Sequence, residues 1–247
     1  KMPMLDKIAI PPKRICPLFI LIESSGGMSG LPIASINTAM EEVLRELTLM
    51  NGVNDDVEIQ IAVLTYDDET RWLTRGLISP EHYVWNELQA GGLSSMGAAF
   101  KELEHALSVK HGFLERESNY SAPAFILVAK REPTDDCFSS MQILKKNNWY
   151  KVGVKIAISF GQTSEVILRE FTADHDTVLN ANEPDELIKM FRFATITSLR
   201  ELTVLRGRIA GEGLYDRTND VVDLLRSVFG NSAQTLQSVF FCPEDEW

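Results

Sequence analysis

Residues 16–30 read CPLFILIESSGGMSG, and this stretch indicates the fold of the chain. Its first half is almost continuously apolar, which is typical of a central strand covered on both faces. The serines and glycines that follow favour a tight loop. After the loop, apolar side chains recur at helical spacing, at Ile33, Ile36, Met40, Val43, Leu44 and Leu47. The sequence therefore predicts a buried strand, a polar loop and an amphipathic helix, in that order.

The same alternation continues along the chain and predicts an α/β fold. We expect further strands at 57–66, 71–78, 122–130, 151–160 and 176–181. We expect further helices at 96–107, 135–147, 164–173 and 184–202. Segment 71–78 follows an acidic turn and should pair with 57–66 as a hairpin. Ser94 or Ser95 should cap the helix at 96–107. The expected fold is a Rossmann-like, doubly wound, mostly parallel six-stranded sheet with helices on both faces.

This topology also predicts where a functional surface should lie. In open parallel sheets, ligands bind at the carboxyl ends of the strands. That places loops 23–29, 91–95 and 130–136 together on one rim.

We divide the chain into three parts by the character of its sequence. Residues 1–12 are a lead-in, 13–202 form the α/β domain, and 203–247 are expected to be a helical carboxyl-terminal extension. Within the extension, 216–230 carries an apolar helical stripe. That helix either packs back on the domain or forms a partner-binding tail.

Composition excludes several classes of partner. The 24 basic and 35 acidic residues give a net charge of -11, and the basic residues form no stripe. Nucleic acids and anionic membranes attract clustered Lys and Arg, so neither is an expected partner. The three cysteines have no metal-ligand spacing, and no apolar run approaches the roughly 20 residues of a membrane span. We expect a cytoplasmic protein.

No motif of an enzyme is present. The loop at residues 23–30 lacks the lysine of a phosphate-binding P-loop, and the chain contains no G-x-S-x-G pentapeptide. The four histidines are scattered and indicate no catalytic base. The sequence predicts a protein that is not an enzyme.

Three loops in order resemble those of a known family. ESSGGMSG (23–30), GGLSSMGAAF (91–100) and VAKREPTDD (128–136) are similar to the three ligand loops of von Willebrand factor A (vWA) domains. The chain most resembles bacterial stand-alone vWA proteins of the TerY type. The resemblance implies a metal-ion-dependent adhesion site, in which Asp, Ser and Thr oxygens hold Mg²⁺.

Position by position, this chain departs from that metal site. Glu23 stands at the leading Asp and Ser25 at the first Ser, but Gly27 replaces the second Ser. Leu93 replaces the Thr, and Lys130 replaces the last Asp. An ammonium repels a divalent cation, so the site is interpreted as degenerate and no cofactor is expected. Lys130 either pairs with Glu23 in place of the ion or extends into solvent.

Three further acidic residues lie near the rim. Glu132, Asp135 and Asp136 form this cluster, which we interpret first as helix capping. The alternative is an acidic recognition patch, or a shifted cation site shared with Glu23.

The leading function is a non-catalytic protein-interaction or scaffold module. The TerY resemblance implies a bacterial signalling or stress-response system, with a protein kinase or a PP2C-like phosphatase encoded nearby as partner. One alternative is an adhesion-type domain that binds Mg²⁺ or Ca²⁺ through Glu23, Ser25 and nearby acidic residues. A second is an enzyme whose site a partner completes.

Overall fold

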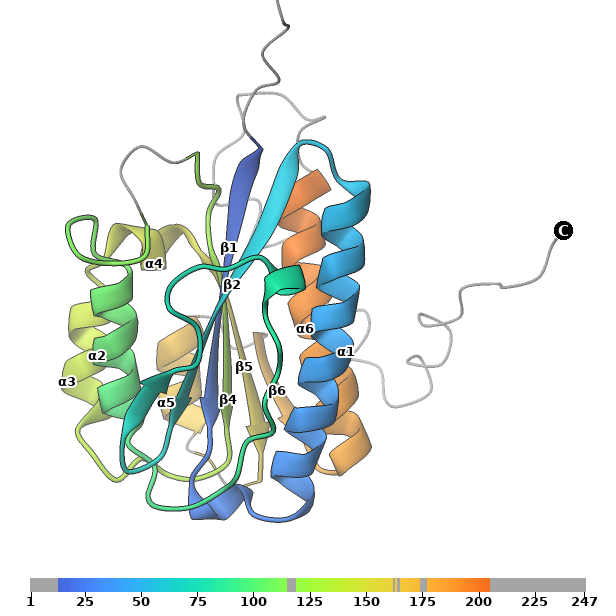
Figure 1. Ribbon diagram of the computed structural model, residues 1–247. Helices are drawn as coiled ribbons and strands as arrows, with labels where there is room; N and C mark the ends of the chain where they lie inside the picture. The colour runs from blue at the N-terminus through green and yellow to red at the C-terminus, as the bar shows by residue number, and fades with distance from the viewer. Residues whose placement is uncertain (1–12, 115–118, 162, 164, 174–176, 205–247) are drawn as a thin grey trace, which may run out of the picture.

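The computed structural model describes residues 13–114, 119–161, 163, 165–173 and 177–204. Within them the chain forms one six-stranded sheet in the order β3-β2-β1-β4-β5-β6 (Figure 1). All neighbouring strands are parallel except β2 and β3. The strands are β1 (Arg14–Glu23), β2 (Val57–Tyr66), β3 (Thr70–Trp72), β4 (Ala124–Ala129), β5 (Val154–Phe160) and β6 (Val178–Ala181). The predicted fold class is confirmed.

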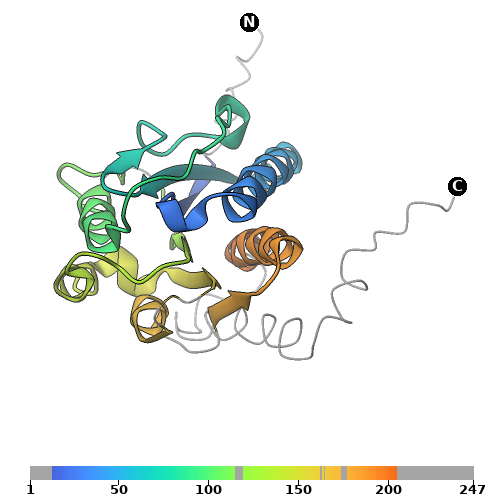
Figure 2. The same cartoon turned by 90° about the horizontal axis from the view of Figure 1, so that it is seen from below.

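Helices cover both faces of this sheet, as the end-on view in Figure 2 shows. One face carries α1 (Leu31–Val53) and α6 (Pro184–Val204), which pack against each other. The opposite face carries α2 (Met96–Ala106), α3 (Cys137–Leu144) and α5 (Glu165–Thr172). Three short helices complete the described elements: η1 (Gly26–Met28), η2 (Pro80–His82) and α4 (Asn148–Val152).

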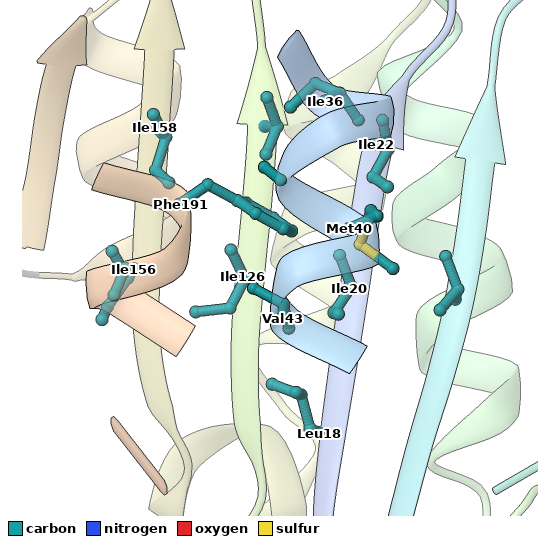
Figure 3. Close-up of a cluster of buried hydrophobic side chains, with 14 of the residues drawn as sticks. Leu18, Ile20, Ile22, Ile36, Met40, Val43, Ile126, Ile156, Ile158 and Phe191 are labelled. Atoms are coloured by element: carbon teal, nitrogen blue, oxygen red, sulfur yellow. The ribbon is translucent and has the colours of Figure 1, made fainter. Parts of the chain in front are cut away.

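Strand β1 is buried because both of its faces contact helices. Leu18, Ile20 and Ile22 point toward α1 and α6, where Phe191 and Met40 pack on them (Figure 3). The side chains between them belong to a second cluster on the opposite face, under α2 and α3. Successive side chains of a strand alternate between faces, so a continuous apolar run is required here.

The expected hairpin partner of β2 is shorter than predicted. Only Thr70–Trp72 forms a strand, and Ile78 adds one isolated bridge to Ile61. Between them, the Thr74 hydroxyl accepts a hydrogen bond from the backbone N–H of Val63 at 3.2 Å. The Thr74 hydroxyl accepts where a backbone carbonyl would accept in a regular strand pair, so the regular pairing with β2 ends.

The helix predicted at 135–147 also differs from the structure. Helix α3 ends at Leu144, and α4 begins at Asn148. The Asn147 side chain accepts hydrogen bonds from the backbone N–H groups of Trp149 and Tyr150, so it caps a new helix and does not continue the first. The first residues of the strand predicted at 151–160 belong to α4.

The predicted lead-in 1–12 lies outside the described residues. So does the predicted carboxyl-terminal extension beyond Val204, where α6 ends. None of the helices in the described part is long and apolar enough to cross a membrane.

Candidate interaction site at the carboxyl edge of the sheet

Three loops meet where the parallel strands end, at the bottom of Figure 1 and facing the viewer in Figure 2. We call residues 23–30, 91–95 and 130–136 the rim. The backbone N–H of Gly26 donates to the carbonyl of Gly92 at 3.0 Å, and that of Gly91 donates to Ser24 at 2.9 Å. Thr134 donates through its backbone N–H to Ser94 at 2.8 Å. The three loops are joined as the topology predicted.

Glu23, at the end of β1, is the centre of the rim. Its side chain is fully buried, and one carboxylate oxygen accepts a hydrogen bond from the Ser25 hydroxyl. The other oxygen accepts from the backbone N–H groups of Lys130 at 2.6 Å and of Arg131 at 3.1 Å. Ser25 in turn accepts from the backbone N–H of Gly27 at 3.2 Å and caps η1. The loop's own donors therefore satisfy this buried carboxylate.

Lys130 adopts neither of the two expected arrangements. Its backbone, and not its ammonium, contacts Glu23, and the ion pair between the two side chains is not among those of the described residues. The side chain is half-buried, with its ammonium 4.7 Å from the centre of the Phe160 ring. The stem of Lys130 passes beside Gly161, which has a φ of +113°. A cation–π contact thus replaces the ion pair.

Arg131 is the side chain that lies over the first loop. A Cβ atom placed on Gly27 would lie 2.1 Å from Cδ of Arg131 and 2.4 Å from its Cγ. Arg131 therefore fills the space into which a serine at position 27 would extend. The sequence did not indicate a role for this residue. The signal was a glycine in one loop paired with a long side chain in another.

The acidic cluster divides into caps and one exposed side chain. Asp136 is the N-cap of α3 and accepts from the backbone N–H of Ser139, whose hydrogen bonds lower the pKa of this carboxyl. Asp135 accepts from two backbone N–H groups in the first turn of α2, those of Gly97 and Ala98, at 2.9 and 2.8 Å. Glu132 is exposed. The two aspartates therefore act as helix caps.

The predicted serine cap of α2 is wrong. Ser95 is at the N-cap position, but its side chain makes no capping hydrogen bond. The hydroxyl of Ser94 has no hydrogen-bond partner among the described residues. Asp135 reaches α2 from the third loop, so the cap comes from a residue distant in sequence.

The acidic turn after β2 also holds the rim, which the sequence did not indicate. Asp68 accepts from the backbone N–H of Leu93 at 3.0 Å. Asp67 accepts from the Ser24 hydroxyl at 3.0 Å and from Arg71 at 3.0 Å. Gly92 has a φ of +72°, and a Cβ there would collide with Asp68, so the close approach requires glycine.

A surface hollow opens beside the rim. Its volume is about 630 Å³, and it is lined by Leu93, Ser94, Lys130, Arg131, Glu132, Pro133, Thr134 and Gly161. Leu93 is 56% exposed, whereas Ser94 is only 2% exposed. We call this depression the rim hollow.

The residues of the rim do not fit a magnesium ion of the adhesion-site type. Gly27 and Leu93 have no side-chain oxygen, and the oxygens of Glu23 already accept three hydrogen bonds. Lys130 and Arg131 bring positive charge to the same loops. Across the described residues, His, Cys, Asp and Glu form no cluster of three that could hold a metal.

Comparison with known proteins identifies the fold. No protein-family model and no curated protein sequence matches the chain. Among solved structures, a von Willebrand factor type A protein from Catenulispora acidiphila is 16% identical, with a TM-score of 0.54 over 75% of this chain and 43% of that one. Proximal thread matrix protein 1 from the mussel byssus, with a zinc-occupied metal site, is 14% identical over 76% of this chain and 46% of its own, with a TM-score of 0.55.

The von Willebrand factor domain of the pilus tip protein Mfa5 from Porphyromonas gingivalis is 9% identical. It aligns over 81% of this chain and 99% of its own length, with a TM-score of 0.58. Our chain spans less than half the length of the first two structures. At these identities the likeness is one of fold, and the fold is that of a vWA domain.

Proposed function

We propose that this vWA fold is a non-catalytic protein-interaction module that binds its partner through the rim without a metal ion. One observation carries the proposal: the fully buried carboxylate of Glu23 takes its hydrogen bonds from Ser25 and from two backbone N–H groups. These bonds occupy three of the about four acceptor positions of the carboxylate, so a cation would compete with them for its oxygens. Hydrogen bonds between the loops support this arrangement.

Electrostatics supports the absence of a metal. Coulomb repulsion between a divalent cation and an ammonium at about 4 Å amounts to about 8 kcal/mol at surface-like screening. Both Lys130 and Arg131 line the rim hollow, and Arg131 also covers the first loop. Binding of Mg²⁺ would have to overcome these charges with two of the usual ligands missing.

The class of partner follows from the motif resemblance. The loops are most similar to TerY-type vWA proteins, so we propose a role in a bacterial signalling or stress-response system in the cytoplasm. The partner would be a protein, with a kinase or a PP2C-like phosphatase encoded nearby as the first candidates. The negative net charge of -11 favours a protein partner over a nucleic acid.

A calorimetric titration with Mg²⁺ and Mn²⁺ tests the proposal that the rim binds no metal ion. The wild-type chain should release no binding heat. Micromolar affinity that Glu23→Gln abolishes would overturn the proposal. The matched positive control rebuilds the ligand set with five substitutions: Glu23→Asp, Gly27→Ser, Leu93→Thr, Lys130→Asp and Arg131→Gly.

The structure explains why the fifth substitution belongs in this control. With Arg131 in place, a serine side chain at position 27 would meet its Cδ atom. We expect measurable Mg²⁺ affinity with Arg131→Gly and little without it. Equal affinity of the four- and five-substitution variants would show that Arg131 does not block the position.

Partner capture tests the interaction itself. Partners should be cross-linked to the wild-type chain with EDTA present, and Leu93→Asp, on the rim, should lose them. Arg75→Ala is the matched control, because Arg75 is exposed at the opposite end of the sheet beside Ile15. Equal capture by all three chains would place the interaction elsewhere. Clean turnover in a hydrolase and phosphatase screen would contradict the non-catalytic role.

A further inference from the structure

The chain leaves the described part of the structure close to the end of α1. Helices α1 and α6 pack against each other, and both run from the rim to the opposite edge of the sheet, which is at the top of Figure 1. Arg192 of α6 forms ion pairs with Glu42 and Glu46 of α1, which align the two helices. At about 1.5 Å per residue, the end of α6 at Val204 lies about one to two turns beyond the end of α1 at Val53. A segment that follows Val204 therefore begins near the end of α1.

An apolar pair is exposed at that end of α1. Leu49 is 66% exposed and Val53 is 86% exposed, and the two lie about one turn apart. They continue, at helical spacing, the stripe of α1 that carries both glutamates of these ion pairs and contacts α6. A depression of about 100 Å³ beside the pair is lined by Met50, Val53 and Val57, among others. We call Leu49, Val53 and this depression the α1 patch. An exposed apolar surface next to another helix is typical of a docking site.

The sequence beyond α6 contains a segment with a matching apolar stripe. In 216–230, which lies outside the described residues, Val221, Leu225 and Val228 recur at the spacing of one helical face. A helix of this length would extend over about 22 Å. The intervening segment 205–215 can span up to about 36 Å, so it is long enough to turn the chain back onto α1. Length and apolar spacing therefore both fit the α1 patch.

Charge favours this segment over a second copy of the chain as the occupant. Asp55 and Asp56 are exposed in the turn after α1, where the end of the helix adds a partial negative charge. The first cations beyond α6 are Arg206 and Arg208, so opposite charges would lie close together where 205–215 crosses the end of α1. A two-fold contact between two α1 patches would instead bring the acidic turns of both copies together. The covalent connection also gives the segment an effective concentration in the millimolar range, which a separate partner lacks.

We propose that residues 216–230 form an amphipathic helix that docks on the α1 patch of the same chain. Its apolar stripe packs against Leu49 and Val53, and the basic residues of 205–215 cross the acidic turn after α1. The inference does not rest on the function proposed for the rim, because the patch lies at the opposite edge of the sheet (Figure 1). Docking there covers the apolar pair of α1 and leaves the rim accessible to its partner.

A spin label on the segment tests where it lies. Asp223→Cys places the label on the polar face of the proposed helix, and Cys242→Ser removes the other thiol beyond α6. The cysteines of the described residues are buried. In the isotope-labelled full chain, the paramagnetic label should remove the backbone amide signals of 49–56, and reduction of the label should restore them. The signals of 26–28 on the rim should not change. Unchanged signals for 49–56 would overturn the proposal.

Hydrogen exchange tests whether the α1 patch holds the segment. When Leu49→Ser and Val53→Ser are combined, the amides of 216–230 should exchange about tenfold faster than in the wild type, because two aliphatic contacts are lost. Both positions are exposed, so the fold should remain, and circular dichroism checks this. Val166→Ser is the matched control and should exchange as the wild type does, because Val166 is 62% exposed on α5, on the opposite face of the sheet (Figure 2). Equal exchange in the wild type and the double variant would contradict docking on the patch.

Mixed samples identify a different occupant. A spin-labelled chain without isotopes is mixed with an isotope-labelled chain that has no spin label. Loss of the 49–56 signals in this mixture would assign the patch to a second copy and overturn docking within one chain. Protection of 216–230 that arises only when a partner protein is added would overturn it as well. Neither result concerns the rim, because partner capture in the presence of EDTA tests the proposed function separately.

Discussion

Replacing Glu23 with alanine should destabilise the fold strongly, although Glu23 lies at the edge of the sheet. The substitution removes the acceptor of three hydrogen bonds, donated by Ser25 and by the backbone of Lys130 and Arg131. Each donor that loses its acceptor in a buried place costs about 1–3 kcal/mol. Lys130 is only half-buried and Arg131 is exposed, so water can reach part of the space.

These contributions give about 3–5 kcal/mol of lost unfolding free energy, at the low end of the range for three buried donors. For a domain of this size, each kcal/mol lowers the thermal midpoint by about 2–4 °C. The expected fall is therefore about 6–20 °C. Glu23→Gln keeps one oxygen for the two backbone N–H groups, and its amide can donate to Ser25. That variant should lose only about 1–2 kcal/mol, the contribution of the charge.

Urea unfolding followed by circular dichroism measures both variants. Glu41→Ala is the matched control, because Glu41 is exposed on α1, and it should change stability by no more than about 0.5 kcal/mol. Neither Mg²⁺ nor EDTA should alter the wild-type midpoint. A loss below about 1 kcal/mol for Glu23→Ala would refute the reasoning, because the carboxylate would then not join the loops.

Three further outcomes are expected from the same unfolding experiments. Asp135→Ala removes the cap of α2 and should cost about 1–2 kcal/mol, and an unchanged midpoint would contradict this role. Tyr66→Phe leaves the carbonyl of Val128 without its 3.1 Å hydrogen bond and should cost about 1–2 kcal/mol, with no loss expected if water replaces the hydroxyl. Burial lowers the pKa of Lys155 from 10.5 to about 8, so the folded chain releases this proton at a lower pH than the unfolded chain. The unfolding free energy of the wild type should therefore rise relative to Lys155→Met by up to about 3 kcal/mol between pH 8 and 10.5, and parallel pH profiles would contradict the shift.

The sequence predicted the fold because the pattern of each main element has one physical explanation. A continuous apolar run such as that of β1 can be buried only between two helical layers. The short elements were less predictable, because single side chains decide them. Thr74 ends the pairing of β2 through its hydroxyl, and Asn147 starts α4 through its amide. Neither contact has a periodic signal in the sequence.

The candidate site was predictable in position but not in its contacts. The topology placed the three loops together, since parallel strands end at one edge. Two of the three hydrogen bonds to Glu23 come from backbone N–H groups, which every residue except proline has. The side chains of Lys130 and Arg131 therefore gave no indication of these two bonds. The preference of the Lys130 ammonium for Phe160 over Glu23 likewise depends on side-chain direction at the end of β4.

The backbone and the side chains of Lys130 and Arg131 have different roles. Their backbone N–H groups point to Glu23 and join two loops, a contact that does not depend on the side chains. Their side chains line the rim hollow, which belongs to the surface proposed to bind the partner. Stability and recognition should therefore separate by substitution. Met at either position should leave the backbone hydrogen bonds to Glu23 intact and remove a positive charge from the rim hollow. Ala at position 23 should instead weaken the fold that positions both side chains.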